Sequence, residues 1–284
     1  SNDWMRIWHK IEAQDLANSG WNYTSSSSYI TLSFWVKVSV AQTYYVQMRT
    51  SDGTSKNYYF TMNLSANTWT KVTHSIPGHA DISFDNDNGE GIYIAWYGFR
   101  GTVNTGSGQN ANVWYTFDGA TITPDQTSTW WTTNDSTFEI TGVQLEVGDT
   151  ATSFEHRNYG EELMRCMRYY EKHSVDDGNG GYATVCMGYR ASSTRVVIQP
   201  VFRVPKRATN ATFEFNGPMR LYYQNNSSEQ VIDSWTAFQN SQFGLYGGYK
   251  VLDRSGGVGG SDGYTFRMEG SGNTGAYIAF SSEL

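Results

Sequence analysis

Strict alternation of apolar and polar residues is the feature that most limits how this chain can fold. It is clearest over residues 29–40, which read YITLSFWVKVSV. The residues on one side of this pattern are all apolar: Ile30, Leu32, Phe34, Val36, Val38 and Val40. Side chains of a β-strand point alternately to its two faces, so a period of two predicts a strand with one buried face.

The same pattern recurs along the first half of the chain, with turn residues between the repeats. The further candidate strands are 43–50, 57–64, a stretch around Trp69, 91–99, 113–117 and 137–147. Strands at this spacing, without helical periodicity between them, predict an antiparallel sandwich, and about eight strands favour a jelly roll. We therefore expect an all-β fold in which residues 1–157 form an N-terminal antiparallel jelly-roll sandwich.

A short helix is predicted where the alternation stops. Asn158 is placed to be its N-cap, and Glu161, three residues on, completes a capping-box pattern. An apolar stripe follows at helical spacing: Leu163, Cys166, Met167 and Tyr170. We expect residues 158–175 to form a short linking α-helix, which DDGNGG at 176–181 ends. A lone short helix is not stable in water, so its stripe must pack on a domain or on copies of itself about a symmetry axis.

Strand patterns return after the helix and continue almost to Leu284. The candidate strands are 181–189, 194–202, 211–215, 220–224, 243–252, 263–269 and 276–280. The Gly-rich stretches 255–263 and 270–275 are typical of turns. We expect residues 176–284 to form a smaller, C-terminal antiparallel β-sandwich.

Cys166 and Cys186 are the only cysteines, too few for a disulfide scaffold. Cys166 falls on the apolar stripe of the predicted helix, so we expect it to be a small buried hydrophobic residue. A bridge between the two cysteines stays open, because spacing alone does not establish one.

Composition argues against two classes of partner. The net charge is −7 and no stretch concentrates Lys or Arg, so we expect no nucleic-acid partner. No apolar run approaches the roughly 18 residues of a transmembrane helix, so we expect no membrane insertion.

The opening SNDWMRIWHK lacks a signal-peptide core. Trp4 and Trp8 make it look like a segment that docks on something, or the cut point of a longer chain.

One stretch of the chain resembles a block found in bacteriophage tail-fibre and related virion proteins. It runs from Phe138 to about Tyr170 and reads FEITGVQLEVGDTATSFEHRNYGEELMRCMRYY. The family's version contains ITGVQLEVG, ATPFEHR and YGEELALCQRYY; here Ser153 replaces the usual proline and LMRCMRYY replaces LALCQRYY. IEAQDLANSGW at 11–21 and ITLSFWVKVS at 30–39 resemble the start of the same proteins' first domain, which is similar to the jelly rolls of carbohydrate-binding modules. The ending YIAFSSEL resembles their terminal strand.

The resemblance implies a structural, non-enzymatic protein located in the virion, in the tail or another surface appendage. It implies a tail-fibre or spike subunit that binds host-surface glycan as a homotrimer and meets other virion proteins through its N-terminal end. Three alternatives stay open: a head fibre or capsid-decorating protein without a receptor role, a glycan-degrading spike, and a cellular carbohydrate-binding module unconnected to phage. The match from Phe138 to Tyr170 favours the last of these least.

Aromatic residues are the candidates for glycan contacts, because sugar rings stack their C–H faces on Trp and Tyr. In the first domain the candidates are Trp96, Tyr97, Trp114, Trp130 and Trp131, and in the second they are Tyr222, Tyr223, Trp235 and Tyr246. Packing in a core or between subunits is the alternative for each. Trp130 and Trp131 are adjacent, so at least one is exposed, lies in a subunit interface or sits in a bent loop.

Signals for a metal or for catalysis are weak, and we expect neither a cofactor nor an enzyme. A structural Ca²⁺ is the weak alternative, with acidic candidates near the ends of the first domain: Glu12, Asp15, Glu146 and Asp149. Calcium needs about six to eight oxygen ligands, which spacing alone does not supply. The five His residues are scattered, and neither a G-x-S-x-G elbow nor a P-loop is present.

Overall fold

The computed structural model divides the chain into two compact units, Ser1–His156 and Arg157–Glu283. It describes residues 1–175, 183–223, 229–232, 234–260, 263, 265–272 and 275–283. The described strands of both units pair antiparallel in packed sheets, so the predicted all-β fold of two antiparallel sandwiches with a short helix is confirmed.

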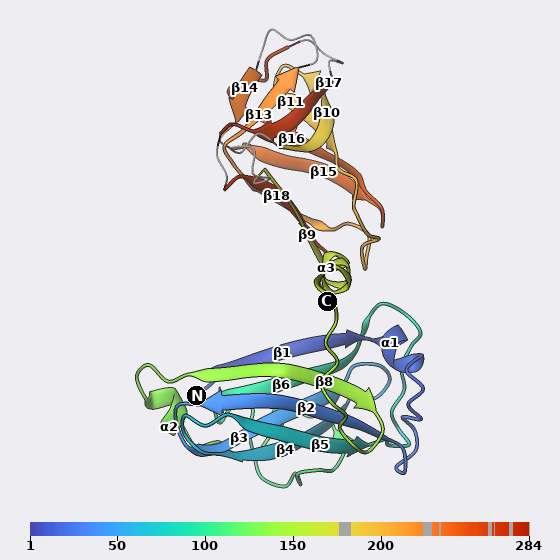
Figure 1. The fold of residues 1–284 in the computed structure, drawn as a ribbon, viewed down its shortest axis with the longest axis vertical. Helices are drawn as coiled ribbons and strands as arrows, with labels where there is room; N and C mark the ends of the chain where they lie inside the picture. The colour runs from blue at the N-terminus through green and yellow to red at the C-terminus, as the bar shows by residue number, and fades with distance from the viewer. Residues whose placement is uncertain are drawn as a thin grey trace. The chain divides into compact units, whose positions relative to one another are not determined.

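The first unit is a two-layer sandwich (Figure 1). Its strands are β1 (Trp4–Glu12), β2 (Tyr29–Val38), β3 (Gln42–Thr50), β4 (Lys56–Leu64), β5 (Thr70–Pro77), β6 (Glu90–Arg100), β7 (Tyr115–Thr116) and β8 (Phe138–Val147). One sheet has the order β1-β6-β3-β4-β7 and the other the order β5-β2-β8. The chain crosses repeatedly between the two sheets, as in a jelly roll. Two short helices, α1 (Ala13–Ala17) and α2 (Thr129–Thr132), lie in its connections.

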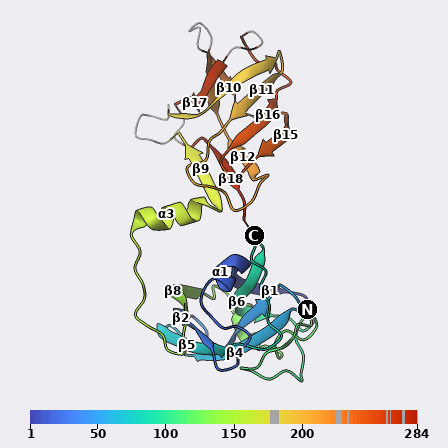
Figure 2. The ribbon, with the colours of Figure 1, turned by 90° about the vertical axis from the view of Figure 1, so that its right-hand side faces the viewer.

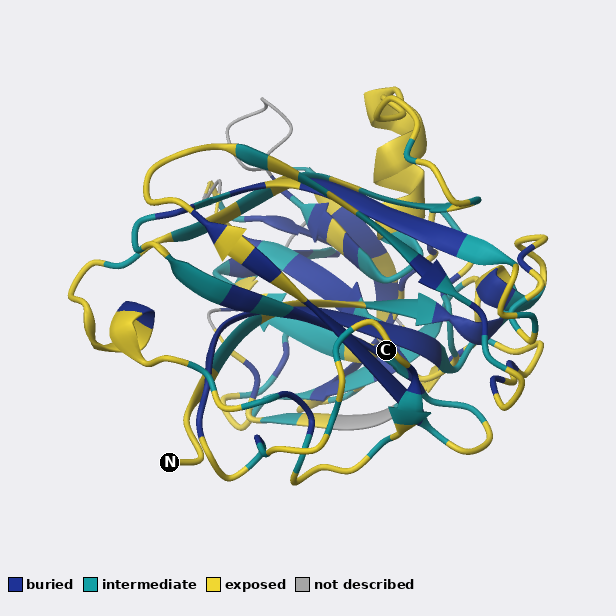
Figure 3. Cartoon of the chain, turned by 90° about the horizontal axis from the view of Figure 1, so that it is seen from below, coloured by how far each residue is buried: buried dark blue, intermediate teal, exposed yellow. Residues whose placement is uncertain are grey.

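The inner faces of these two sheets form the core of the first unit. β2 contributes the residues that its alternation predicts, all of them buried: Ile30, Leu32, Phe34, Val36 and Val38. The facing sheet contributes every second residue of β4 and β6: Tyr58, Phe60, Met62, Ile92, Ile94 and Trp96. Figure 3 shows the buried stretches along the strands and the exposed ones mainly in the connections. Each large apolar side chain buried in this way contributes about 1.5–3 kcal/mol, so the alternation selects the sandwich.

The opening segment with Trp4 and Trp8 forms a strand that the sequence pattern does not predict. β1 pairs with β6 from Trp4↔Arg100 to Glu12↔Glu90. The segment therefore docks on the sheet of its own unit. Its position at the edge of the sheet explains the weak apolar signal, because both of its faces keep exposed residues.

The second unit also contains two sheets. Its described strands are β9 (Tyr170–Ser174), β10 (Thr184–Ser192), β11 (Arg195–Gln199), β12 (Thr212–Asn216), β13 (Met219–Tyr223), β14 (Glu229–Ile232), β15 (Ala237–Phe243), β16 (Gly248–Asp253), β17 (Thr265–Gly270) and β18 (Tyr277–Ser281). The larger sheet has the order β14-β13-β17-β10-β11-β16-β15 and the smaller one β12-β18-β9 (Figure 2). Phe202, Phe243 and Phe280 meet in the core of this unit, with ring centroids 5.0–6.0 Å apart.

A buried ion pair joins the start of the second unit to the segment after β11. The Nζ of Lys206 lies 2.6 Å from Oε2 of Glu171, and neither side chain is exposed to solvent. The backbone N–H of Arg203 donates to the same carboxylate, and Lys206 also donates to the backbone carbonyl of Met167. The pair therefore fixes β9 and the end of the preceding helix in one place.

The predicted linking helix is shorter than expected. Helix α3 spans Tyr159–Met167, and β9 begins at Tyr170, inside the segment 158–175. The helix ends because residues from Tyr170 onward pair with β18. Asn158 is the N-cap as predicted, and its Oδ1 accepts the N–H of Glu161 at 2.9 Å. The DDGNGG stretch, 176–181, lies outside the described residues.

The apolar stripe of α3 is only partly buried by the described residues: Leu163 and Cys166 are exposed, and Met167 is half-buried. None of the helix residues, all of which are described, is buried; Leu163 is 37% and Met164 54% exposed. Cys166 is exposed too, so the expectation of a buried Cys166 is wrong, because the helix becomes partly buried only from Met167 onward. Both cysteines are free, and burial raises the pKa of the Cys186 thiol to about 12.

Across the described residues, the helices are too short or too polar to cross a membrane.

Candidate functional site

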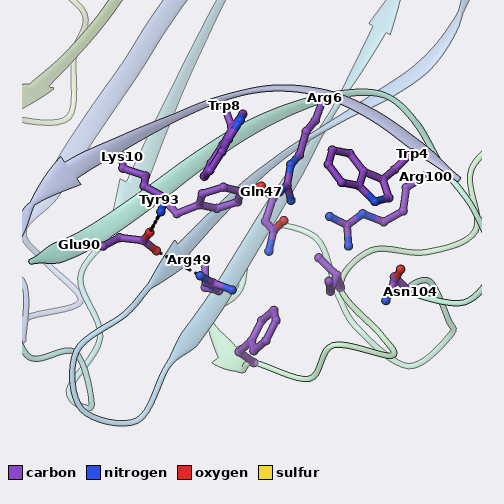
Figure 4. A pocket seen from close by; sticks show the side chains of 12 residues that line it. Trp4, Arg6, Trp8, Lys10, Gln47, Arg49, Glu90, Tyr93, Arg100 and Asn104 are labelled. Carbon is purple, nitrogen blue, oxygen red and sulfur yellow. Dashed lines mark hydrogen bonds and ion pairs between the residues drawn. The ribbon is translucent and has the colours of Figure 1, made fainter. Parts of the chain in front are cut away.

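A groove of about 270 Å³ lies on the outer face of the five-stranded sheet of the first unit. Its lining includes Trp4, Arg6, Trp8, Lys10, Tyr93 and Arg100 (Figure 4). Four of these lining residues lie on β1: Trp4, Arg6, Trp8 and Lys10. Successive members of this set are two residues apart, so the alternation of a β-strand brings their side chains to one face. Antiparallel pairing sets them against β6, with Lys10 opposite Tyr93 and Trp4 opposite Arg100. The two strands therefore supply rings and cations to the same surface.

Three aromatic rings surround one guanidinium in this groove. The Cζ of Arg6 lies 4.3 Å from the ring centroid of Trp4, 5.0 Å from that of Trp8 and 5.2 Å from that of Tyr93. Figure 4 shows Arg6 between the two indoles. Contacts of this kind are attractive and hold both partners in place. Trp4 and Trp8 nevertheless remain 50% and 47% exposed, so each keeps ring surface available to a ligand.

One carboxylate lies among the cations of the groove. Glu90 pairs with Lys10 at 2.8 Å and with Arg49 at 3.1 Å, and it accepts the hydroxyl of Ser51 at 2.5 Å. Burial of Glu90 favours its neutral form, but the hydrogen bonds from Lys10, Ser51 and Arg49 outweigh burial and lower the pKa of Glu90. Glu90 is therefore ionised at neutral pH and neutralises part of the local positive charge.

Hydrogen-bonded polar side chains form the floor beneath the groove. The hydroxyl of Tyr97 donates to Oε1 of Gln47 at 2.7 Å and accepts a hydrogen bond from Arg100. The amide of Gln47 donates to Oδ1 of Asn57 at 2.5 Å, and Asn57 donates in turn to the hydroxyl of Tyr115. Buried networks whose members are paired in this way hold side chains in fixed positions. The floor therefore holds Arg100 in a defined orientation.

Three of the predicted glycan-contact residues belong to the core instead. Trp96 is 3% exposed and packs edge-on against Phe34. The indoles of Trp114 and Trp130 are also buried, and they donate hydrogen bonds to the backbone carbonyls of Pro77 and Thr137. The prediction that these rings contact a ligand is corrected, because their faces are covered by protein.

The adjacent pair Trp130 and Trp131 divides between core and surface. The two residues lie in the short helix α2, which turns them in different directions. Trp131 is 43% exposed and stacks on Phe99 at 5.4 Å. Tyr97, the remaining candidate of the first unit, is buried in the floor of the groove, where its hydroxyl positions Arg100. Tyr97 is 0% exposed and is not among the lining residues, so the prediction that Tyr97 contacts a ligand is corrected as well.

Of the four predicted glycan-contact residues in the second unit, two are buried and two lie at the surface. Tyr223 is buried against Phe266, and Trp235 is 8% exposed and packs edge-on against Phe215. The prediction that Tyr223 and Trp235 contact a ligand is corrected for that reason. Tyr246 is 69% exposed, and Tyr222 is half-buried beneath the guanidinium of Arg267, whose Cζ lies 4.4 Å from its ring centroid. Tyr222 and Tyr246 remain available at the surface of this unit.

The acidic candidates for calcium are engaged in local hydrogen bonds. Glu12 is buried and accepts the side-chain amide of Gln14 at 2.6 Å, whereas Asp15 is exposed. Glu146 accepts the N–H and hydroxyl of Thr152 at 2.9 and 2.7 Å, and Asp149 is exposed. Within the described part of the chain, no cluster of three or more His, Cys, Asp or Glu is arranged to hold a metal ion.

The predicted glycan-contact residues do not include any of the residues that line the groove, and those that β1 contributes to it are Trp4, Arg6, Trp8 and Lys10. A signal for them is present, because every second residue from position 4 to position 10 is aromatic or cationic. An alternation between rings and cations does not resemble the apolar alternation of a core strand. It becomes meaningful only when β6 is known to pair alongside.

No protein-family model matches this sequence. The curated proteins contain no significant match to it either.

Proposed function

We propose that this chain is a non-enzymatic subunit of a bacteriophage surface appendage, a tail fibre or spike, whose first unit binds a glycan of the host surface. The proposal has two supports. One is the resemblance of residues 138–170 to tail-fibre proteins. The other, which carries the choice of an adhesive role, is the groove with half-exposed Trp4 and Trp8.

The groove has the chemistry that sugar binding needs. Indole rings offer flat apolar surfaces for the C–H faces of a pyranose, and fixed polar groups beside them bond the hydroxyls. Here Trp4 and Trp8 supply the rings, while Asn104 and Arg49 lie among the polar lining. A volume of about 270 Å³ suits a short part of a saccharide chain.

The exposed stripe of α3 supports assembly of copies. Leu163 and Cys166 of the stripe, and Met164 next to it, are exposed on a helix that begins close to the start of the second unit. We propose a homotrimer, in which these residues contact their counterparts. Three linked grooves convert weak single-site binding into firm attachment, because the second and third contacts form at high effective concentration.

The test is an array of bacterial surface polysaccharides probed with the intact chain and two variants. Trp4→Ala/Trp8→Ala removes the exposed rings of the groove. Trp35→Ala, on the other sheet, removes a ring of similar exposure (43%) and is the matched control. We expect the parent and the control to bind the same polysaccharides and the double variant to lose at least about tenfold in affinity, since a stacked ring contributes about 1–3 kcal/mol.

Three results would count against this proposal. Binding that survives in the Trp4→Ala/Trp8→Ala variant places adhesion outside the groove. Release of reducing sugar from the bound polysaccharide favours a glycan-degrading spike. Labelled antibody that marks the phage head, together with an array that shows no binding, favours a head fibre or capsid-decorating protein.

A further inference from the structure

The groove concentrates positive charge on a protein that is acidic as a whole. Its lining includes Arg6, Lys10, Arg49 and Arg100, against the single carboxylate of Glu90, while the full chain has a net charge of −7. Glu90 pairs with Lys10 and Arg49. Among the described residues, no ion pair joins Arg6 or Arg100 to a carboxylate, so these two cations are not neutralised.

Each of the three arginines has an unused donor in this groove. The Nε atoms of Arg6, Arg49 and Arg100 are buried, and no described group accepts a hydrogen bond from them. A buried donor without a partner is costly, and arginine stays charged in proteins. These Nε atoms are covered by protein atoms, so they mark three guanidinium groups that the chain satisfies only in part, and a ligand would meet each guanidinium at another of its N–H groups.

Arg100 is the most constrained of the three. It is 5% exposed, its Cζ lies 4.2 Å from the ring centroid of Tyr97, and it donates to the hydroxyl of that ring. Burial is the main cause that lowers the pKa of Arg100, and the nearby positive charge of Arg6 lowers it further. A negative charge placed between Arg6 and Arg100 would relieve both effects.

We propose that the ligand of this groove is an acidic saccharide, whose carboxylate or phosphate binds between Arg6 and Arg100 while its ring contacts Trp4 and Trp8. The inference rests on the proposed glycan-binding function and narrows its ligand class. Guanidinium groups match the planar geometry of carboxylate and phosphate oxygens and bind them through paired hydrogen bonds. A neutral sugar forms weaker hydrogen bonds with the guanidinium groups, because its hydroxyls carry no charge.

The test compares matched sugars by saturation-transfer NMR on the intact chain. Glucose, galactose and mannose are each measured beside the corresponding uronic acid and 6-phosphate, with inorganic phosphate as a further probe. We expect an acidic member to bind at least about tenfold tighter than its neutral partner, since hydrogen bonds to charged groups are the stronger class. The uronic-acid and 6-phosphate arms distinguish a carboxylate ligand from a phosphate ligand.

Variants assign the effect to the groove. Arg6→Gln removes a cation from a half-buried position and is expected to abolish the preference for acidic sugars. Lys71→Gln removes one cation from an exposed position on β5 of the other sheet and is the matched control. The wild-type comparison of acidic with neutral sugars needs no substitution, so the proposal stays testable even if a groove variant misfolds.

The possible outcomes separate this inference from the function on which it rests. Equal binding of neutral and acidic sugars, or an acidic preference that survives in Arg6→Gln, overturns the inference and leaves glycan binding intact. Binding of inorganic phosphate without any saccharide contradicts an acidic sugar as the ligand. Absence of binding on both the polysaccharide array and the NMR panel overturns the proposed function itself.

Discussion

At the scale of single residues, a methyl group added at Gly98 would collide with the indole of Trp130. A Cβ atom at this position would lie 2.8 Å from the nearest ring atom of Trp130. That indole is buried and held by its hydrogen bond to the carbonyl of Thr137, so it has little freedom to move away. The absence of a side chain at Gly98 is therefore a packing requirement.

We expect Gly98→Ala to destabilise the first unit by about 1–3 kcal/mol, the usual cost of overpacking a core. Urea unfolding followed by tryptophan fluorescence measures the effect, since all the tryptophans except Trp235 lie in the first unit. Gly119→Ala is the matched control, because a Cβ there meets nothing within 4 Å. Equal stability of the two variants would contradict this account of Gly98.

His74 predicts a dependence of stability on pH at the same scale. Burial lowers the pKa of His74 to about 4, and the neutral ring stacks on Phe60 at 4.0 Å and bonds the hydroxyl of Tyr58 at 2.9 Å. The unfolded chain takes up this proton at higher pH than the folded chain does. Its contribution to stability is therefore complete above about pH 6.5 and declines as the pH falls toward 4.

The measurement is urea unfolding of the first unit at a series of pH values. We expect the parent to lose stability between about pH 6.5 and pH 4, and His74→Gln to lose less over this window. Glutamine retains a hydrogen-bonding partner for Tyr58 but does not titrate. Parallel pH profiles for the two proteins would exclude His74 as the source of the dependence.

At the scale of elements, the Glu171–Lys206 pair ties β9 to the segment after β11. Burial alone would raise the pKa of Glu171, but hydrogen bonds from His173, Lys206 and the backbone N–H of Arg203 outweigh it and lower the pKa to about 2. The folded state thus favours the carboxylate. This contribution to stability is present above about pH 4.5 and is lost as the pH falls toward 2.

We expect Glu171→Gln to destabilise the second unit by about 3–5 kcal/mol, because it leaves the Lys206 ammonium buried without its counter-charge. The double variant Glu171→Gln/Lys206→Met removes that charge and should recover much of the loss. Hydrogen exchange of β9 amides during mild denaturation measures the effect locally. A double variant no more stable than the single one would show that the buried charge is not the cause.

Prediction from sequence succeeded for elements whose burial follows a simple period. β2 and β4 were predictable because alternate residues enter one core, and the start of α3 because Asn158 caps it. β1 was missed since an edge strand with rings and cations on one face carries little apolar signal. The end of α3 was misplaced because a long-range ladder with β18 overrides the local helical pattern after Met167.

The candidate site was less predictable than the fold because it depends on contacts between residues that are far apart in the sequence. Single aromatic residues do not reveal which face of a strand they occupy or whether another element covers them. Trp96 and Tyr97 are neighbours on β6, yet one enters the core and the other the floor of the groove. The groove depends on pairing of β1 with β6, a contact between distant parts of the sequence.

At the scale of the whole molecule, the exposed stripe of α3 bears on the state of assembly. For the proposed homotrimer we expect light scattering to give a mass near three times that of the 31.9 kDa chain. Leu163→Glu/Met164→Glu places two charges on the exposed apolar surface of α3 and should yield monomers, because like charges at a buried interface are strongly unfavourable. Val103→Glu, at a loop residue that is 55% exposed, is the control. A parent chain that is monomeric would contradict the trimer.

The contrast between the two cysteines gives each copy of the chain a single accessible chemical handle. Cys166 is open to solvent on α3, while Cys186 is buried with a thiol that resists ionisation. Since the thiolate is the reactive form, a maleimide dye will attach at Cys166 of a separated, folded chain and leave Cys186 unmodified. In the proposed homotrimer Cys166 contacts its counterparts, so slow labelling of the assembled protein beside fast labelling of separated chains would show that the helix surface is in use.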